Sequence, residues 1–105
     1  MNKVIRDGKV AVLYSPGYGA GWSTWTSSKK RDIALFHPKL VEMVESGKRL
    51  EITDEWAQKN LGISLCTLGN DQLEIEWIEQ GSSFHVNEYD GSESIIFGSL
   101  DMVKA

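Results

Sequence analysis

Two Asp-Gly dipeptides, at residues 7–8 and 90–91, place tight chain reversals near both ends of this chain. Each lies between two runs rich in β-branched and aromatic residues. The runs are 3–6 and 9–14 around the first dipeptide, and 83–89 and 94–97 around the second. Asp-Gly favours the two-residue type I′ turn, whose central residues both need positive φ, so it is a strong hairpin signal. The sequence therefore predicts an antiparallel hairpin at each end of the chain.

The middle of the chain has the start and stop signals of two helices. Pro38 suits a first helical position and Gly47 a left-handed helix end, with an apolar stripe between them. Thr53 can cap a second helix, which we expect to end at Gly62. Residues 73–78 then alternate apolar and acidic, which is typical of a half-buried strand. The predicted fold class is α+β, a mostly antiparallel β-sheet with two short helices inserted between an N-terminal hairpin and a C-terminal β-meander.

Length, charge and cysteine content limit the possible classes of protein. The 105 residues predict a single domain, 1–105, and the net charge of −4 gives no global basic field for long DNA or RNA. Cys66 is the only cysteine, which fits a reducing cytoplasm; it lies in residues 63–68, which we expect to form a buried strand. The sequence has neither a signal-peptide pattern nor about 20 consecutive apolar residues, so we expect no membrane association.

Residues 15–25, directly after the predicted strand 9–14, are the segment most suggestive of a binding site. They contain three glycines and three large aromatic residues. Glycine lets backbone N–H groups approach a ligand closely, and aromatic rings offer faces for stacking. We interpret the segment as a ligand loop; the alternative is a sharp reversal whose tryptophans fold into the core. The candidate contacts are Tyr18, Gly19, Ala20, Gly21, Trp22 and Trp25.

A second candidate is the polar turn at residues 87–94. Asn87 would hydrogen-bond a base or ribose, Tyr89 would stack, and Asp90 would accept from ribose hydroxyls. The alternative is an ordinary Asp-Gly hairpin with a polar outer face, and the residues alone leave both open. We expect the acidic residues of this part of the chain on the polar face of the sheet. They are Glu74, Glu76, Glu79, Glu88, Asp90 and Glu93.

No arrangement typical of an enzyme is recognisable in the sequence. Trp22 stands where a Walker loop needs Lys and where the dinucleotide fingerprint needs its last glycine. His37 and His85 form no pair at helical spacing, and there is no Cys-x-x-Cys for zinc. Ser15 lacks the Gly-x-Ser-x-Gly elbow. We therefore expect no catalytic residues, no cofactor and no metal site.

Segments 10–22, 35–44 and 74–78, followed by 87–94, together resemble the first Thoeris anti-defence family of small phage and prophage proteins. The resemblance spans about residues 2–95. It implies an oligomeric, non-enzymatic protein in the cytoplasm of a host bacterium. Such a protein binds the cyclic ADP-ribose isomer made by a TIR-domain defence enzyme, or in some relatives cyclic oligonucleotides. Sequestering the signal keeps the defence effector inactive.

The resemblance also implies roles for individual residues. Adenine would stack on an aromatic ring, the diphosphate would lie against the glycine-loop N–H groups, and Arg31 or Arg6 would supply charge. Ribose and base edges would meet Asn87 and Asp90. The candidate stacking residues are Tyr18, Trp22, Trp25 and Tyr89.

Arginine is scarce in this chain, which leaves the residue that would hold the phosphates open. The only arginines are Arg6, Arg31 and Arg49. Two other classes of protein also stay open. One is a protein-interaction module that docks through the aromatic loop, since exposed Trp and Tyr often dominate such contacts. The other is an enzyme that degrades a signalling nucleotide.

Overall fold

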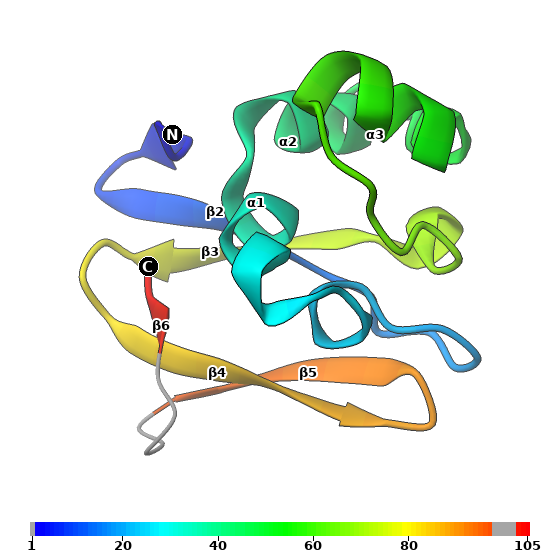
Figure 1. Ribbon diagram of the computed structural model, residues 1–105. Helices are drawn as coiled ribbons and strands as arrows, with labels where there is room; N and C mark the ends of the chain where they lie inside the picture. The colour runs from blue at the N-terminus through cyan, green and yellow to red at the C-terminus, as the bar shows by residue number, and fades with distance from the viewer. Residues whose placement is uncertain (1, 98–102) are drawn as a thin grey trace.

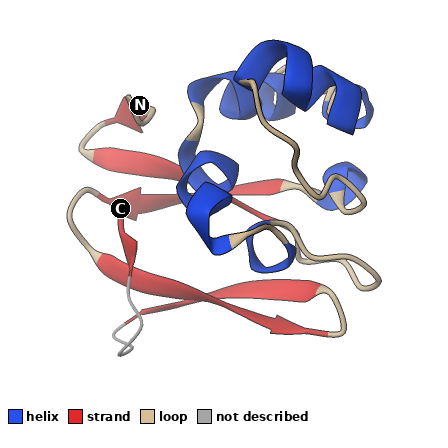
Figure 2. Ribbon diagram, in the orientation of Figure 1, coloured by secondary structure: helices blue, strands red, loops and turns tan. Residues whose placement is uncertain are grey.

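The computed structural model describes residues 2–97 and 103–105, which form three layers (Figure 1). Helices cover one face of a three-stranded antiparallel sheet, and a second three-stranded antiparallel sheet lies against its other face (Figures 1 and 2). The α+β class expected from the sequence is confirmed. No helix in the described ranges is long and apolar enough to cross a bilayer.

The first sheet has the order β1-β2-β3 and contains β1 (Ile5–Arg6), β2 (Lys9–Tyr14) and β3 (Glu74–Glu79). The predicted Asp-Gly turn joins β1 to β2, with φ of 52° at Asp7 and 74° at Gly8. β2 is therefore the central strand. Its apolar residues are needed on both faces, because one face meets helices and the other meets the second sheet.

The second sheet has the order β5-β4-β6 and contains β4 (Ser83–Tyr89), β5 (Ser92–Phe97) and β6 (Val103–Lys104). The second Asp-Gly turn joins β4 to β5, with φ of 51° at Asp90 and 85° at Gly91. Both predicted hairpins are thus confirmed, and each turn has the two positive φ values of a type I′ turn.

The predicted C-terminal meander is wrong in its connectivity, because β3 pairs with β2 and not with β4. Ile78 of β3 and Phe84 of β4 are both buried, and both pack in the core between the two sheets. The chain therefore passes from one layer to the next between these two residues. Alternation along each strand shows that one face is buried, but it does not specify which strand lies alongside.

Within residues 2–97 and 103–105 the α-helices are α1 (Arg31–Phe36), α2 (Pro38–Glu45) and α3 (Asp54–Leu61). The last two begin as predicted: His37 Nδ1 accepts from the Lys39 N–H, and Thr53 Oγ1 accepts from the N–H of Trp56. The helix α1 was not predicted, because six residues are too few to display a helical period. Four short 3₁₀ turns complete the helical structure of the described residues. They are Ser23–Trp25, Ser28–Lys30, Arg49–Glu51 and Asn70–Gln72.

Two hydrophobic clusters fill the spaces between the layers, and β2 contributes to both because successive side chains of a strand point to opposite faces. Ala11 and Leu13 pack under the helices, whereas Val10 and Val12 face the second sheet. The sheet–sheet cluster includes the edge-to-face pair of Phe36 and Phe84, with ring centroids 6.2 Å apart. The core therefore fixes the positions of α1 and β4 relative to each other.

Residues 63–68 form no strand, so the expected buried strand around Cys66 is wrong. Leu65 is buried, but Leu68 is 75% exposed and Cys66 is only half-buried. Leu65 and Ile63 pack into the cluster beneath the helices. A short apolar run can bury its side chains either in a β-strand or in an irregular segment that packs under helices, and its composition does not distinguish the two.

Candidate functional site

The predicted ligand loop, residues 15–25, is organised around the buried carboxylate of Glu93. One oxygen of Glu93 accepts from the Ser15 N–H at 2.9 Å. The other accepts from the Trp22 N–H at 2.8 Å, the Thr24 N–H at 3.0 Å and the Thr24 hydroxyl at 2.6 Å. Glu93 is 2% exposed, so its expected place on the polar face of the sheet is wrong. Glu93 pairs with Glu88 of β4, which lies four residues after the buried Phe84, so Glu93 is on the same face of the second sheet as Phe84 and faces the loop.

The turn between β4 and β5 also packs directly on this loop. The Gly19 N–H donates to the Asp90 carbonyl at 2.9 Å, and the Ser92 hydroxyl donates to the Pro16 carbonyl at 2.6 Å. A Cβ at Gly91 would overlap the backbone nitrogen of Ala20. The loop therefore lies backbone against backbone with a hairpin that is more than seventy residues later in the chain.

The expectation that the loop N–H groups hold a diphosphate is wrong for the groups already engaged. A cluster of backbone N–H groups is suited to an anion, and here the anion is the protein's own carboxylate. The N–H of Gly19 is likewise engaged by Asp90. Of the loop glycines, Gly19 has a positive φ of 102°, a Cβ at Gly17 would meet the Gln72 side chain, and a Cβ at Gly21 would meet Thr24 and Trp25. The close approach of the loop to the β4–β5 turn depends instead on Gly91.

Trp22 is a core residue, so its expected stacking on a ligand is also wrong. Its side chain is completely buried in the cluster beneath the helices, and its Nε1–H donates to the Ala34 carbonyl at 2.6 Å. A ring enclosed in this way offers no face to a ligand. The other two aromatic residues of the loop remain accessible, with Tyr18 74% and Trp25 41% exposed.

The structure places the remaining predicted contacts apart from one another. Tyr18, Gly19 and Ala20 line a cavity of about 360 Å³. Asn87 and Tyr89 are exposed on the outer face of the second sheet, opposite Ser94 and Ser92 in β5. Gly21 is buried, and the Asp90 side chain is exposed at the hairpin turn. Arg31 lines a different cavity, so the ten predicted residues do not meet in one site.

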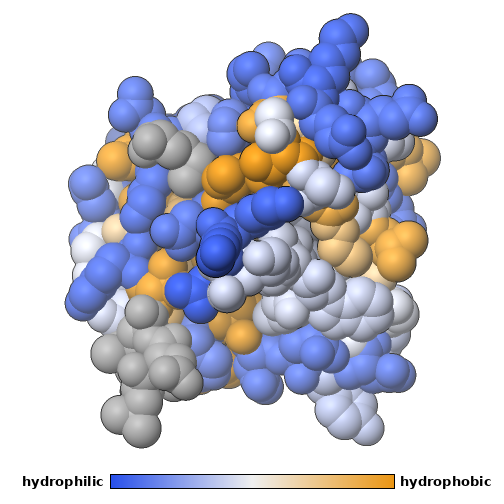
Figure 3. Space-filling model, in the orientation of Figure 1, coloured by the Kyte–Doolittle hydropathy of each residue, from blue (hydrophilic) through white to orange (hydrophobic). Residues whose placement is uncertain are grey.

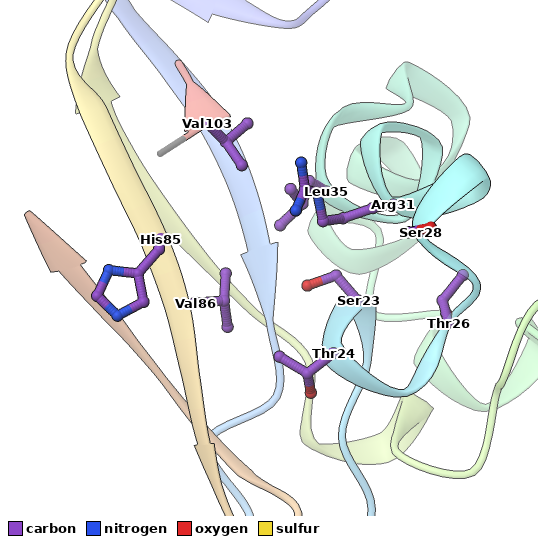
Figure 4. Close-up of a pocket in the computed structure, with 9 residues that line it drawn as sticks. All are labelled: Ser23, Thr24, Thr26, Ser28, Arg31, Leu35, His85, Val86 and Val103. Atoms are coloured by element: carbon purple, nitrogen blue, oxygen red, sulfur yellow. The ribbon is translucent and has the colours of Figure 1, made fainter. Parts of the chain in front are cut away.

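That cavity, of about 370 Å³, lies between the segment 23–35 and strands β4 and β6 (Figure 4). Figure 4 shows Ser23 and Arg31 pointing into the space, whereas the His85 ring projects from the other side of β4. The wall on the helical side is rich in hydroxyls and the opposite wall is apolar. The lining residues are Ser23, Thr24, Thr26, Ser28, Arg31, Leu35, His85, Val86 and Val103.

Ser23 and Arg31, which both point into this cavity, have no protein acceptor among the described residues. The buried Nδ1 of His85 also lacks a partner there, but its ring lies on the other side of β4. Ser23 is 3% exposed, and its hydroxyl has no hydrogen-bond partner there. Among the described residues the salt bridge joins Arg6 to Glu45. No Asp or Glu side chain of those residues forms an ion pair with the Arg31 guanidinium. A buried hydroxyl without a partner is uncommon in folded proteins and calls for a physical explanation. The arrangement can donate several hydrogen bonds to a small anionic or hydroxylated ligand.

Sequence reasoning missed both Glu93 and the hydroxyl-rich wall of the cavity. Residues 23–28 contain five Ser and Thr just before Arg31, and that composition was the available signal. Glu93 gave no local signal, because its burial depends on a loop far away in the sequence.

Comparisons with known protein families, curated proteins and solved structures found no match to this chain. Within residues 2–97 and 103–105, no group of three or more His, Cys, Asp and Glu side chains is placed to hold a metal ion.

Proposed function

We propose that this protein binds and sequesters a small cyclic nucleotide signal, of the cyclic ADP-ribose type, without cleaving it. This is the role that the resemblance to the first Thoeris anti-defence family implies, in the cytoplasm of a bacterial host. The cavity beside Arg31 is the observation that carries the proposal. Its volume of about 370 Å³ falls in the range of small-molecule sites, of roughly 300–1,000 Å³.

The charge distribution supports an anionic ligand at this cavity. The whole chain has a net charge of −4, yet among the residues that the structure describes no Asp or Glu lines the cavity, and the one charged side chain of that lining is Arg31. A cation in a lining without carboxylates favours phosphate over a neutral ligand. Trp25, which is partly exposed, comes directly after the wall residues Ser23 and Thr24 in the sequence. Its ring is therefore a candidate for stacking with the base of a bound nucleotide.

We further propose that the active form is an oligomer of this chain. Asn87 and Tyr89 share a face of β4 with His85, since successive side chains of a strand alternate, and the His85 ring projects away from the cavity (Figure 4). Contact between copies would bring that face against the cavity of a neighbour, which would unite the two sets of predicted contacts. Light scattering with and without the nucleotide tests this point.

A second candidate function, a protein-docking module, is favoured by the exposed side chains around the loop. Tyr18 is 74% and Leu68 75% exposed, and both line the cavity of about 360 Å³. However, apolar surface on the face seen in Figure 3 occurs as separate patches between hydrophilic side chains. Protein interfaces centre on a clustered group of anchor residues, so we place this function second.

Calorimetric titration with the cyclic ADP-ribose isomer made by an activated TIR enzyme tests the proposal. We expect binding, with the ligand recovered unchanged after heat denaturation and identified by its mass. An altered ligand would assign the protein to the nucleotide-degrading enzymes. Absence of binding would contradict sequestration and favour the docking module.

A further inference from the structure

We infer that the cavity lined by Arg31 and Ser23 is an oxyanion subsite that binds a phosphate group. The identity of the ligand that carries this phosphate depends on the proposed function, whereas the phosphate-binding chemistry is argued from the residues of the cavity alone. Arg31 supplies the charge, Ser23 supplies a buried donor, and Ser28 adds a second hydroxyl to the wall. The hydroxyl of Thr26 also lines the wall, but it already donates to the Trp22 carbonyl at 2.9 Å.

The Ser23 hydroxyl is the strongest single indication of a ligand here. It is nine-tenths buried or more, has no partner among the described residues, and points into the cavity (Figure 4). A buried hydroxyl without a partner costs free energy, which a ligand oxygen in the cavity would recover. Packing alone does not require Ser at position 23, because Ala would occupy nearly the same space without burying a hydroxyl that lacks a partner.

The position of Ser23 is also fixed before any ligand binds. The N–H groups of its neighbours Trp22 and Thr24 both donate to the same oxygen of Glu93. The 3₁₀ turn Ser23–Trp25 is therefore anchored on both sides of Ser23. Fixing a donor in advance lowers the entropy cost of binding, as expected of a binding site.

The guanidinium of Arg31 has the chemistry that the other wall of a phosphate site needs. It is charged at all physiological pH values and presents a planar set of donors that matches two phosphate oxygens at once. Figure 4 shows it extending from the start of α1 towards β4, across the same space into which Ser23 points. Anion and guanidinium would meet there without a competing carboxylate from residues 2–97 and 103–105 in the lining.

Three other cavities in the described residues lack this combination. The cavity at Arg6 includes Glu45, which already pairs with Arg6 at 2.6 Å. The cavity at Arg49 includes Glu51 and Asp71. The cavity at Tyr18 includes Asp71 and no Lys or Arg. The cation without a carboxylate therefore distinguishes the Arg31 cavity from each of them.

Titration with inorganic pyrophosphate and with ribose 5-phosphate, followed by calorimetry, tests the subsite. Because a hydrogen bond to a charged group contributes about 1.5–3 kcal/mol, and about 1.4 kcal/mol is tenfold in affinity, we expect Arg31→Gln and Ser23→Ala each to weaken binding by roughly tenfold or more. Lys29→Gln is the matched control, since it removes a neighbouring positive charge that does not line the cavity. We expect it to change affinity by less than about twofold at moderate salt.

Equal losses in Arg31→Gln and Lys29→Gln would overturn the inference, because they would indicate diffuse attraction and not a site. No binding of either probe to the wild-type protein would overturn it as well. Parallel titration with the cyclic nucleotide separates the two proposals. If phosphates bind through Arg31 and the nucleotide does not bind, the subsite stands and sequestration fails. If the nucleotide binds equally well to Arg31→Gln, sequestration stands and the subsite fails.

Discussion

Two polar regions lie next to each other along residues 15–31, and they differ in whether their donors have acceptors. In the glycine loop, three backbone N–H groups and one hydroxyl converge on Glu93, so every one of these donors is satisfied within the chain. In the adjoining cavity, the Ser23 hydroxyl has no acceptor among the described residues. The hydrogen bonds of the first region therefore stabilise the fold. The second region has a buried donor without an acceptor, as expected of a binding site.

Replacing Glu93 tests the first region and should have the largest effect. In Glu93→Gln an amide NH₂ would face N–H donors, so we expect a loss of about 3 kcal/mol of unfolding free energy from unpaired buried groups. Urea denaturation measures this. The control Glu79→Gln changes an exposed strand residue and should stay within about 0.5 kcal/mol of wild type. Similar losses in both variants would mean that the carboxylate does not organise the loop.

A pair of glycine substitutions tests the close packing between the loop and the hairpin. Gly91 has φ of +85° and Gly81 has φ of +88°, so Ala is strained at both positions. Only at Gly91 would the new Cβ meet backbone, that of Gly19 and Ala20. We expect Gly81→Ala to cost about 1 kcal/mol and Gly91→Ala at least about 2 kcal/mol, measured by thermal unfolding. Equal costs would show that the loop is not pressed against the turn.

Removing a hydroxyl from each region sharpens the contrast between them. Ser23→Ala removes a group without a partner, so we expect stability within about 0.5 kcal/mol of wild type or slightly above it. Thr24→Ala removes a hydrogen bond to Glu93 and should cost about 1–2 kcal/mol. Urea denaturation of both variants checks the difference. A loss above about 1 kcal/mol in Ser23→Ala would contradict a hydroxyl available to a ligand.

The smallest expected effect is a pH dependence that comes from neither region. The pKa of His37 is lowered from its ordinary value of 6.5, first by desolvation and second by the charge of Lys39. The unfolded chain therefore binds this proton more readily, so the stability contribution is complete above about 6.5 and is lost as pH falls through the lower folded pKa.

His37→Asn isolates this contribution, because Asn caps a helix without titrating in this range. Melting temperatures between about pH 7.5 and 5.5, a range in which histidine titrates, should fall less in the variant than in the wild-type protein. An identical fall would assign the dependence to another group.

The elements that the sequence predicted correctly are those with local causes. The conformation of the turns at Asp7 and Asp90 is set by the glycine that follows each of them. Thr53 caps a helix by accepting a hydrogen bond from the N–H of Trp56, three residues later. The elements that it predicted wrongly depend on distant partners. The pairing of β3 with β2 follows from which layer buries Ile78, and an alternating pattern does not contain that information.

The candidate site shows the same division. Arg31 was a predicted contact and does line the cavity, because its charge makes it a candidate wherever it lies. Trp22 was misassigned, since a large aromatic ring beside glycines suits a binding loop and a small core equally well. Its burial follows from the position of α1, which accepts the Trp22 Nε1–H at Ala34 and which the sequence did not reveal.

The link between Glu93 and the loop also sets an order of events during synthesis. Ser15 and Glu93 are separated by 78 positions, so the loop meets its acceptor only after those further residues have been made. Closing so long a segment lowers the conformational entropy of the chain, and this loss precedes the formation of the four hydrogen bonds to Glu93. The N-terminal hairpin can form early from local contacts, whereas the cavity wall at Thr24 takes its final shape among the last steps of folding.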